Sequence, residues 1–205
     1  MRNHTRMLSG LAALAALVVL AGGCIFSPDD DVINPPVPPS YPFPATQDLL
    51  MTNFQTAYDQ MNIEEYRNVL HTEFKFKFAE GSTVEPSGYY TREQDLQTTT
   101  RMFNGEQGMS ETGEIKPGVR DIDFRLLRRL SPEWEDVPDT DPDFPGSTRA
   151  IYDVELVFNL SDDANSTITV ESQQIFYAMP VAEVQEDSSI RQRYYLFGQM
   201  DLDSQ

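Results

Sequence analysis

From residue 46 onward, apolar residues first follow helical spacing. Steps of one, three and four predict a helix over 47–60, with one buried stripe: Leu50, Phe54, Ala57, Tyr58 and Met61. Thr46 is its expected N-cap. A second helix is expected from Asn62 to about His71, and a third from Thr91 to about Phe103. Both open with a capping residue followed three positions later by Glu or Gln.

Strict alternation predicts strands elsewhere. Residues 73–78 place three phenylalanines on one face, and longer strands are expected over 119–130, 148–160, 167–179 and 190–202. The strand at 119–130 has one apolar face: Ile122, Phe124, Leu126 and Leu130. In the strand at 167–179 the apolar residues change face between Val170 and Ile175, which predicts a bulge near 171–174. Residues 81–88 and 104–118 are expected to be irregular.

The order of these elements is helix, helix, strand, helix and then a run of antiparallel strands. This order predicts an α+β domain over residues 46–205, with three helices packed on one face of a curved, mainly antiparallel sheet. About 160 residues are enough for one domain with a substantial core.

The first 24 residues have the pattern of an export signal. Arg2 and Arg6 precede an apolar run over 11–21, and small residues lead directly to Cys24. A membrane-spanning helix needs roughly 20 apolar residues, more than the space between Met7 and Cys24 allows. The segment resembles the lipobox of bacterial lipoproteins, which implies that residues 1–23 are removed and Cys24 is acylated.

Such a lipid anchor implies a location in the bacterial cell envelope. Ile25 stands where an Asp would favour the inner membrane, so the resemblance implies the outer membrane. Cys24 is the only cysteine, which excludes an internal disulfide, a cysteine nucleophile and a cysteine-based zinc site. Residues 24–45 hold seven of the fourteen prolines and are expected to form an extended tether. A ligand for a proline-recognition domain is the alternative.

The chain is strongly acidic, with 33 acidic and 15 basic residues and a net charge of −18. Proteins that bind nucleic acid or anionic head groups present Lys and Arg, so this charge argues against both kinds of partner. Acidity also keeps an exported domain soluble without any partner.

Four segments carry a further resemblance: residues 49–58, 63–66, 69–76 and 194–197. Their order is similar to that of the nuclear transport factor 2-like superfamily, which includes ketosteroid isomerases and SnoaL-like proteins. The resemblance implies a cone-shaped α+β fold over about 46–203. It implies no single activity, because this fold carries isomerases, dehydratases, hydrolases and non-catalytic binding domains.

The pocket candidates are Tyr66, His71, Tyr152 and Tyr194. An isomerase of this fold needs an inward acid near a tyrosine. The strand acids all alternate with the apolar face and are expected in solvent: Asp121, Asp123, Asp153 and Glu155. No catalytic residue is therefore assigned. His71, expected at a helix end, suits a general base or a favourable charge at the helix dipole. One histidine cannot build a multi-histidine metal site.

Residues 131–146 form an acidic loop. Asp139, Asp141 and Asp143 alternate as calcium ligands do, but Phe144 and Arg149 replace the Gly and Glu that an EF-hand requires. The sequence favours a solvated loop over a calcium site. Trp134, the only tryptophan, is expected either to hold the loop against the domain or to form part of a contact surface.

Together these features predict a lipid-anchored envelope protein without a metal or cofactor. The expected role is non-catalytic, either binding a small apolar ligand in the cone or contacting a second copy or an envelope protein through the sheet. An isomerase or hydrolase acting on a small apolar substrate is the alternative.

Overall fold

The computed structural model describes residues 41–82, 86–109, 113–162, 166–184 and 188–202. These belong to the compact unit formed by residues 39–205. The expected signal segment and Cys24 lie outside the described residues. No helix among the described residues is long and apolar enough to span a membrane.

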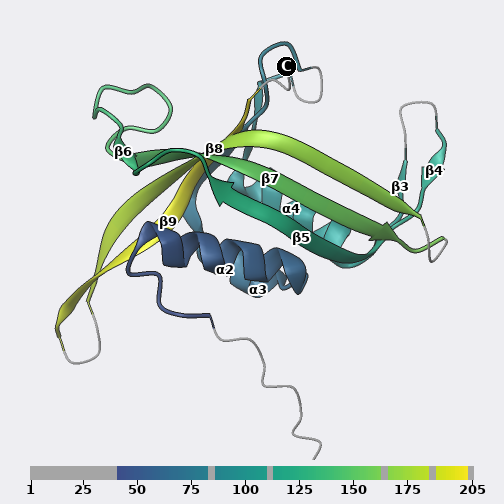
Figure 1. Ribbon diagram of the computed structural model, residues 1–205, viewed down its shortest axis with the longest axis horizontal. Helices are drawn as coiled ribbons and strands as arrows, with labels where there is room; N and C mark the ends of the chain where they lie inside the picture. Colours follow the sequence, from purple (N-terminus) through teal and green to yellow (C-terminus); the bar gives the residue numbers. More distant parts are fainter. Residues whose placement is uncertain (1–40, 83–85, 110–112, 163–165, 185–187, 203–205) are drawn as a thin grey trace, which may run out of the picture. The chain divides into compact units, whose positions relative to one another are not determined.

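Three helices and nine strands make up the described domain (Figure 1). In chain order they are α2 Gln47–Asp59, α3 Ile63–Val69, β1 Leu70–Lys77, β2 Tyr89–Thr91, α4 Arg92–Phe103, β3 Gly108–Met109, β4 Ile115–Lys116, β5 Val119–Arg129, β6 Glu135–Asp136, β7 Thr148–Leu160, β8 Thr167–Val184 and β9 Ile190–Asp201. The predicted α+β class is confirmed.

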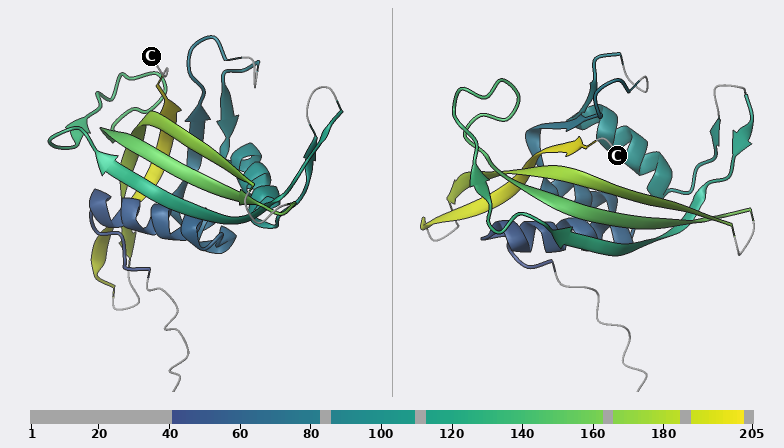
Figure 2. Two further views of the ribbon diagram at one scale, coloured as in Figure 1. Left: turned by 45° about the vertical axis from the view of Figure 1, so that its right-hand side comes forward. Right: turned by 45° about the horizontal axis from the view of Figure 1, so that its top comes forward.

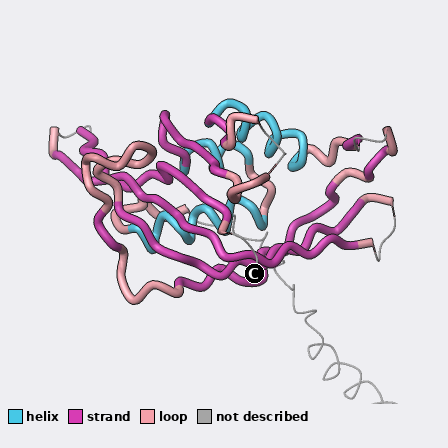
Figure 3. Tube along the Cα trace, turned by 90° about the horizontal axis from the view of Figure 1, so that it is seen from above, coloured by secondary structure: helices cyan, strands magenta, loops and turns pink. Residues whose placement is uncertain are grey.

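The main sheet has the strand order β2-β1-β9-β8-β7-β5, with β6 paired to β7. All its pairings are antiparallel except β1 with β9, which is parallel. The sheet curves around the helices, which lie on its concave side (Figures 2 and 3). The region expected to be irregular at 104–118 contains the small hairpin β3–β4.

The helix starts follow the predicted capping chemistry. The backbone N–H of Leu49 donates to the Thr46 hydroxyl, and that of Glu65 donates to the Asn62 side chain, each at 3.2 Å. Thr91 and Gln94 form a complete capping box at the start of α4. These caps satisfy N–H groups that have no partner within the helix.

The end of α3 corrects one prediction. This helix ends at Val69, and Leu70 already has extended backbone angles. His71 is therefore the second residue of β1 and not a helix-end residue. The early stop is explained by Leu70, which pairs in parallel with Leu196 on β9.

The apolar face of β5 is also different from the prediction. Its register against β7 shifts between Phe124 and Leu126, so the alternation changes phase there. Leu127, and not Leu126, packs against the main core. Leu130 is 41% exposed.

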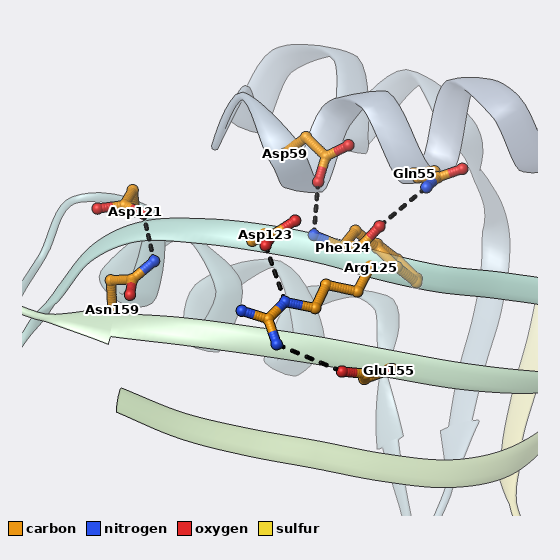
Figure 4. Close-up of polar contacts among 8 residues, drawn as sticks. All are labelled: Gln55, Asp59, Asp121, Asp123, Phe124, Arg125, Glu155 and Asn159. Atoms are coloured by element: carbon orange, nitrogen blue, oxygen red, sulfur yellow. Dashed lines mark hydrogen bonds and ion pairs between the residues drawn. The ribbon is translucent and has the colours of Figure 1, made fainter. Parts of the chain in front are cut away.

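This shift lies where α2 covers the free edge of β5 (Figure 4). The Phe124 N–H donates to Asp59 Oδ1 at 2.7 Å, and Gln55 Nε2 donates to the Phe124 carbonyl at 3.0 Å. The Phe124 peptide groups have no strand partner on this side, since β5 ends the sheet. Helix side chains thus satisfy an edge that would otherwise be open to pairing with another chain.

The bulge predicted near residues 171–174 is not present. β8 pairs with β7 without interruption from Thr167 to Ala178, and the shift lies in its pairing with β9, between Tyr177 and Ala178. The apolar pattern changes because both faces of β8 are covered here. Phe176 and Ala178 face the main core, while Ile175 and Tyr177 belong to a second cluster.

The acidic loop covers this second cluster, which also contains Val137, Phe144 and Phe197. The Phe144 ring stacks on Tyr177, with centroids 3.9 Å apart. It also lies directly over Gly198, where an added Cβ would come within 2.0 Å of the ring. The loop therefore places an aromatic side chain on the sheet face opposite the helices.

Candidate functional site

Aromatic side chains fill the space between the helices and the sheet. Phe54 and Tyr58 of α2 contact rings from α3, α4, β5 and β8 at centroid distances of 5.2–6.1 Å. The exposed fractions of Phe54, Tyr66 and Phe176 are 2%, 1% and 0%. Neighbouring side chains therefore enclose these three rings almost completely.

An acid lies inside this packed cluster. Tyr66 Oη on α3 donates to Asp95 Oδ2 on α4 at 2.8 Å, and Asp95 is 8% exposed. Burial raises the pKa of Asp95 to about 6, and the hydrogen bond from Tyr66 acts in the opposite direction. Burial also raises the pKa of both Tyr58 and Tyr66, so the tyrosines stay neutral and can donate to the carboxylate.

Asp95 was not predicted as a site residue from the sequence. An acid in the first turn of a helix ordinarily interacts with the helix dipole in solvent, and Asp95 has that position in α4. The one available signal was its place next to Leu96, which is also buried. The four strand acids, in contrast, are at the sheet surface as expected: Arg120, Arg125 and Arg128 pair with Asp121, Asp123, Asp153 and Glu155.

The four pocket candidates do not share one site. Tyr66 is enclosed in the aromatic cluster, and Tyr194 packs partly buried against the same core. Tyr152 and His71 line two separate pockets. The lipidation candidate Cys24 is outside the described residues.

Tyr152 lies in a pocket of about 520 Å³ between α2, the end of β5 and the loop after it. The charged residues that line this pocket, Asp48 and Arg129, pair with each other, with Arg129 Nη1 2.9 Å from Asp48 Oδ1. Burial raises the pKa of Tyr152 to about 12. Trp134 packs against Tyr152 with centroids 6.0 Å apart, so it holds the start of the acidic loop on the domain.

His71 lies in a second pocket of about 330 Å³, at the junction of α3, α4, β1 and β9. Its ring contacts Phe197 edge-on at 5.0 Å, and Nδ1 accepts the N–H of Glu73 at 3.2 Å. Burial lowers the pKa of His71 from its usual value; Glu73 acts against this change and Arg92 adds to it. The lowered pKa favours the neutral imidazole, and because Nδ1 accepts a hydrogen bond, Nε2 is the nitrogen left to donate.

The acidic loop uses its aspartates internally. Asp141 Oδ1 accepts the N–H groups of Asp143 and Phe144 at 2.9 and 2.8 Å, and these bonds lower the pKa of Asp141. Asp143 pairs with Lys77 of β1. Among the described residues, no three His, Cys, Asp or Glu side chains are grouped as a metal site.

Comparison with known proteins gives matches among solved structures alone. No family model matches the chain, and no curated protein matches it. A proposed aromatic ring hydroxylase from Novosphingobium aromaticivorans is 13% identical, with a TM-score of 0.48 over 78% of this chain and 87% of that one. A proposed dehydratase of the nuclear transport factor 2-like family from Streptomyces avermitilis is 9% identical, with a TM-score of 0.44 over 78% and 94%.

A proposed SnoaL-like polyketide cyclase from Shewanella denitrificans is 10% identical, with a TM-score of 0.40 over 76% of this chain and 88% of that one. At these identities and TM-scores, the activities and sites of these proteins do not carry over to this chain.

Proposed function

We propose that this chain is an exported lipoprotein, anchored through Cys24 in the cell envelope, whose domain binds a partner or ligand without catalysis. The enclosed aromatic interior is the observation that supports a role without catalysis. Asp95 and Tyr66 are a suitable acid and donor for isomerase chemistry, but they face each other within a packed cluster. A substrate would have no space beside them.

The anchor is tested by mass spectrometry of the protein purified from bacterial membranes. The expected mature chain begins at Cys24 and carries a diacylglyceryl thioether on its sulfur. Cys24→Ala should remove the lipid, while Ser27→Ala, a matched change in the same segment, should keep it. A wild-type protein that retains residues 1–23 or lacks lipid would contradict the anchor.

The closed interior is tested with a neutral apolar fluorescent probe, N-phenyl-1-naphthylamine. The folded wild-type protein should not bind it. Phe54→Ala is the positive control, because truncating this ring opens a cavity at the centre of the cluster. Tight binding of the probe by the wild type, abolished by filling the site with Ala57→Leu, would favour the alternative of an enzyme or carrier for apolar molecules.

The Asp95–Tyr66 pair is the specific observation that keeps the isomerase alternative. That function requires the interior to open, so substrate-like apolar ligands should then bind near Asp95 and change its titration. If no such ligand binds, the pair is a structural link between α3 and α4.

A further inference from the structure

Arginines from three different elements line the pocket that contains His71. Arg67 comes from the end of α3, Arg92 from the first position of α4 and Arg193 from β9. No carboxylate lines the pocket. This is notable in a chain with 33 acidic and 15 basic residues, where most cations are expected to meet an acid.

Two of these guanidinium groups use only part of their hydrogen-bonding capacity. Arg92 Nη2 donates to the Arg67 carbonyl at 3.2 Å, and Arg193 Nη2 donates to the Asn68 carbonyl at 3.3 Å. Both bonds satisfy carbonyls at the end of α3. The Nε atoms of Arg92 and Arg193 are buried without a hydrogen-bond partner in the described part of the chain. A guanidinium has five N–H donors, and a buried donor without a partner is unfavourable.

The ion pairs of these arginines are weak. Arg193 lies 3.7 Å from Glu183, whose carboxylate also accepts the Tyr195 hydroxyl. Arg67 is 3.7 Å from Glu64 at an exposed position. Within the described residues Arg92 has no ion pair. By contrast, Arg129 lies 2.9 Å from Asp48 and Arg149 lies 3.3 Å from Glu135.

Neighbouring rings hold this arrangement in place. The Arg193 guanidinium lies 4.7 Å from the centre of the Tyr195 ring, a cation–π contact that restricts its rotation. His71 is fixed by its contacts with Phe197 and with the Glu73 N–H. Arg193 and His71 are therefore held in place by their neighbours at this pocket.

We infer that this pocket binds the phosphate group of a small phosphorylated molecule. Guanidinium groups that approach from three elements suit a tetrahedral anion, which offers oxygens in several directions. A carboxylate, by contrast, can bind both of its oxygens to the two parallel N–H groups of a single guanidinium. The volume of about 330 Å³ is several times that of a phosphate, given about 30 Å³ for one water. It therefore leaves room for an organic part. The inference rests on the proposed binding role and names its ligand class.

The test uses histidine-labelled, untagged full-length chain in neutral detergent at constant pH. The chain is produced without export so that residues 1–23 are retained, and it then has two histidines, His4 and His71, which makes the imidazole NMR spectrum simple. Added inorganic phosphate should shift the His71 signal and leave His4 unchanged. High salt should weaken the effect, because it screens the arginines.

Variants then locate the site. Arg92→Gln and Arg193→Gln should each raise the apparent Kd for phosphate roughly tenfold or more. Arg101→Gln, on the same helix as Arg92, and Arg191→Gln, next to Arg193 on β9, remove the same charge outside the pocket and should leave the Kd within about twofold. Circular dichroism checks that each variant is folded. The shift of the His71 signal in the wild-type protein tests phosphate binding without any variant.

Further ligands identify the source of the phosphate. Glycerol 3-phosphate represents a soluble ester, and short-chain phosphatidic acid below its micelle concentration represents a lipid. Tighter binding of either one supports the inference and selects that source. No His71 shift with any of the three phosphates, or equal binding of acetate, would overturn it. That result would not affect the proposed lipid anchor at Cys24 or the closed interior, which are tested separately by mass spectrometry and by probe binding.

Discussion

Replacing Asp95 with asparagine is expected to stabilise the domain near neutral pH. Asp95 is 8% exposed, and burial raises its pKa from 3.8 to about 6. Asparagine resembles the protonated acid in shape and lack of charge, and its carbonyl can still accept the Tyr66 hydroxyl. The variant therefore keeps the hydrogen bond but never has to bury a charge.

The magnitude follows from the two pKa values of Asp95. The pKa is higher in the folded state, so the folded state binds the proton more tightly. Its contribution to stability is fully present below about pH 4 and is lost as the pH rises through about 6. A rise of about two pH units, at 1.36 kcal/mol each, corresponds to about 3 kcal/mol. The wild type should lose about that amount relative to Asp95→Asn between pH 4 and pH 7.

The assay is urea denaturation of both proteins at several pH values across this range. The quantity of interest is the difference in free energy of unfolding, because the other carboxylates titrate in both proteins and cancel. Glu93→Gln is the matched control: it removes an exposed carboxylate from the same helical turn and should not stabilise the domain near pH 7 as Asp95→Asn does. If the Asp95→Asn difference is constant between pH 4 and pH 7, the burial argument is wrong.

Three further changes test other contacts. Phe144→Ala removes the ring stacked on Tyr177 and should cost about 3 kcal/mol in urea denaturation; a cost below about 1 kcal/mol would mean that the loop does not cover the sheet. Gly198→Ala should displace the same ring, because its Cβ would lie 2.0 Å from Phe144, and a near-ultraviolet circular dichroism spectrum unchanged from wild type would count against that contact. Thr91→Ala breaks the capping box of α4 and should lower the free energy of unfolding by about 1 kcal/mol, whereas Thr91→Ser should retain most of it; equal losses would mean that the hydroxyl does not cap the helix.

Helix starts and most strand bounds could be predicted because their signals are local. A capping side chain and the N–H group that it satisfies are three residues apart, as at Thr46, Asn62 and Thr91. Alternation along a strand is also a short-range pattern. These features depend on neighbouring residues, so a single sequence contains them.

The errors arose where a distant segment decides the outcome. The apolar pattern of β8 predicted a bulge because the sequence does not show that Phe144, more than 30 positions earlier, covers the second face of this strand. β1 begins early because it pairs with β9. A periodic pattern shows how many faces are apolar but not which segment covers each one.

The candidate sites were harder to predict for the same reason. Asp95 has the position of a surface acid in its helix, and only α3 and its tyrosine make the site buried. The three arginines come from separate elements, and no spacing along the chain connects them. His71 was recognised as a candidate, but its neighbours were not.

The parallel pairing of β1 with β9 also governs the order in which this domain can be assembled. Leu70 pairs with Leu196, and β1 and β9 are the paired strands of the main sheet that lie farthest apart in sequence. In the strand order, β9 lies between β1 and β8. Without β9, the strands β2 and β1 share no edge with β8, β7 and β5. A chain emerging from its N-terminus therefore cannot join the two parts of its sheet until nearly the last residues have appeared. Contacts so distant in sequence are slow to form, so a nascent or C-terminally shortened chain should remain open to proteases until β9 is in place.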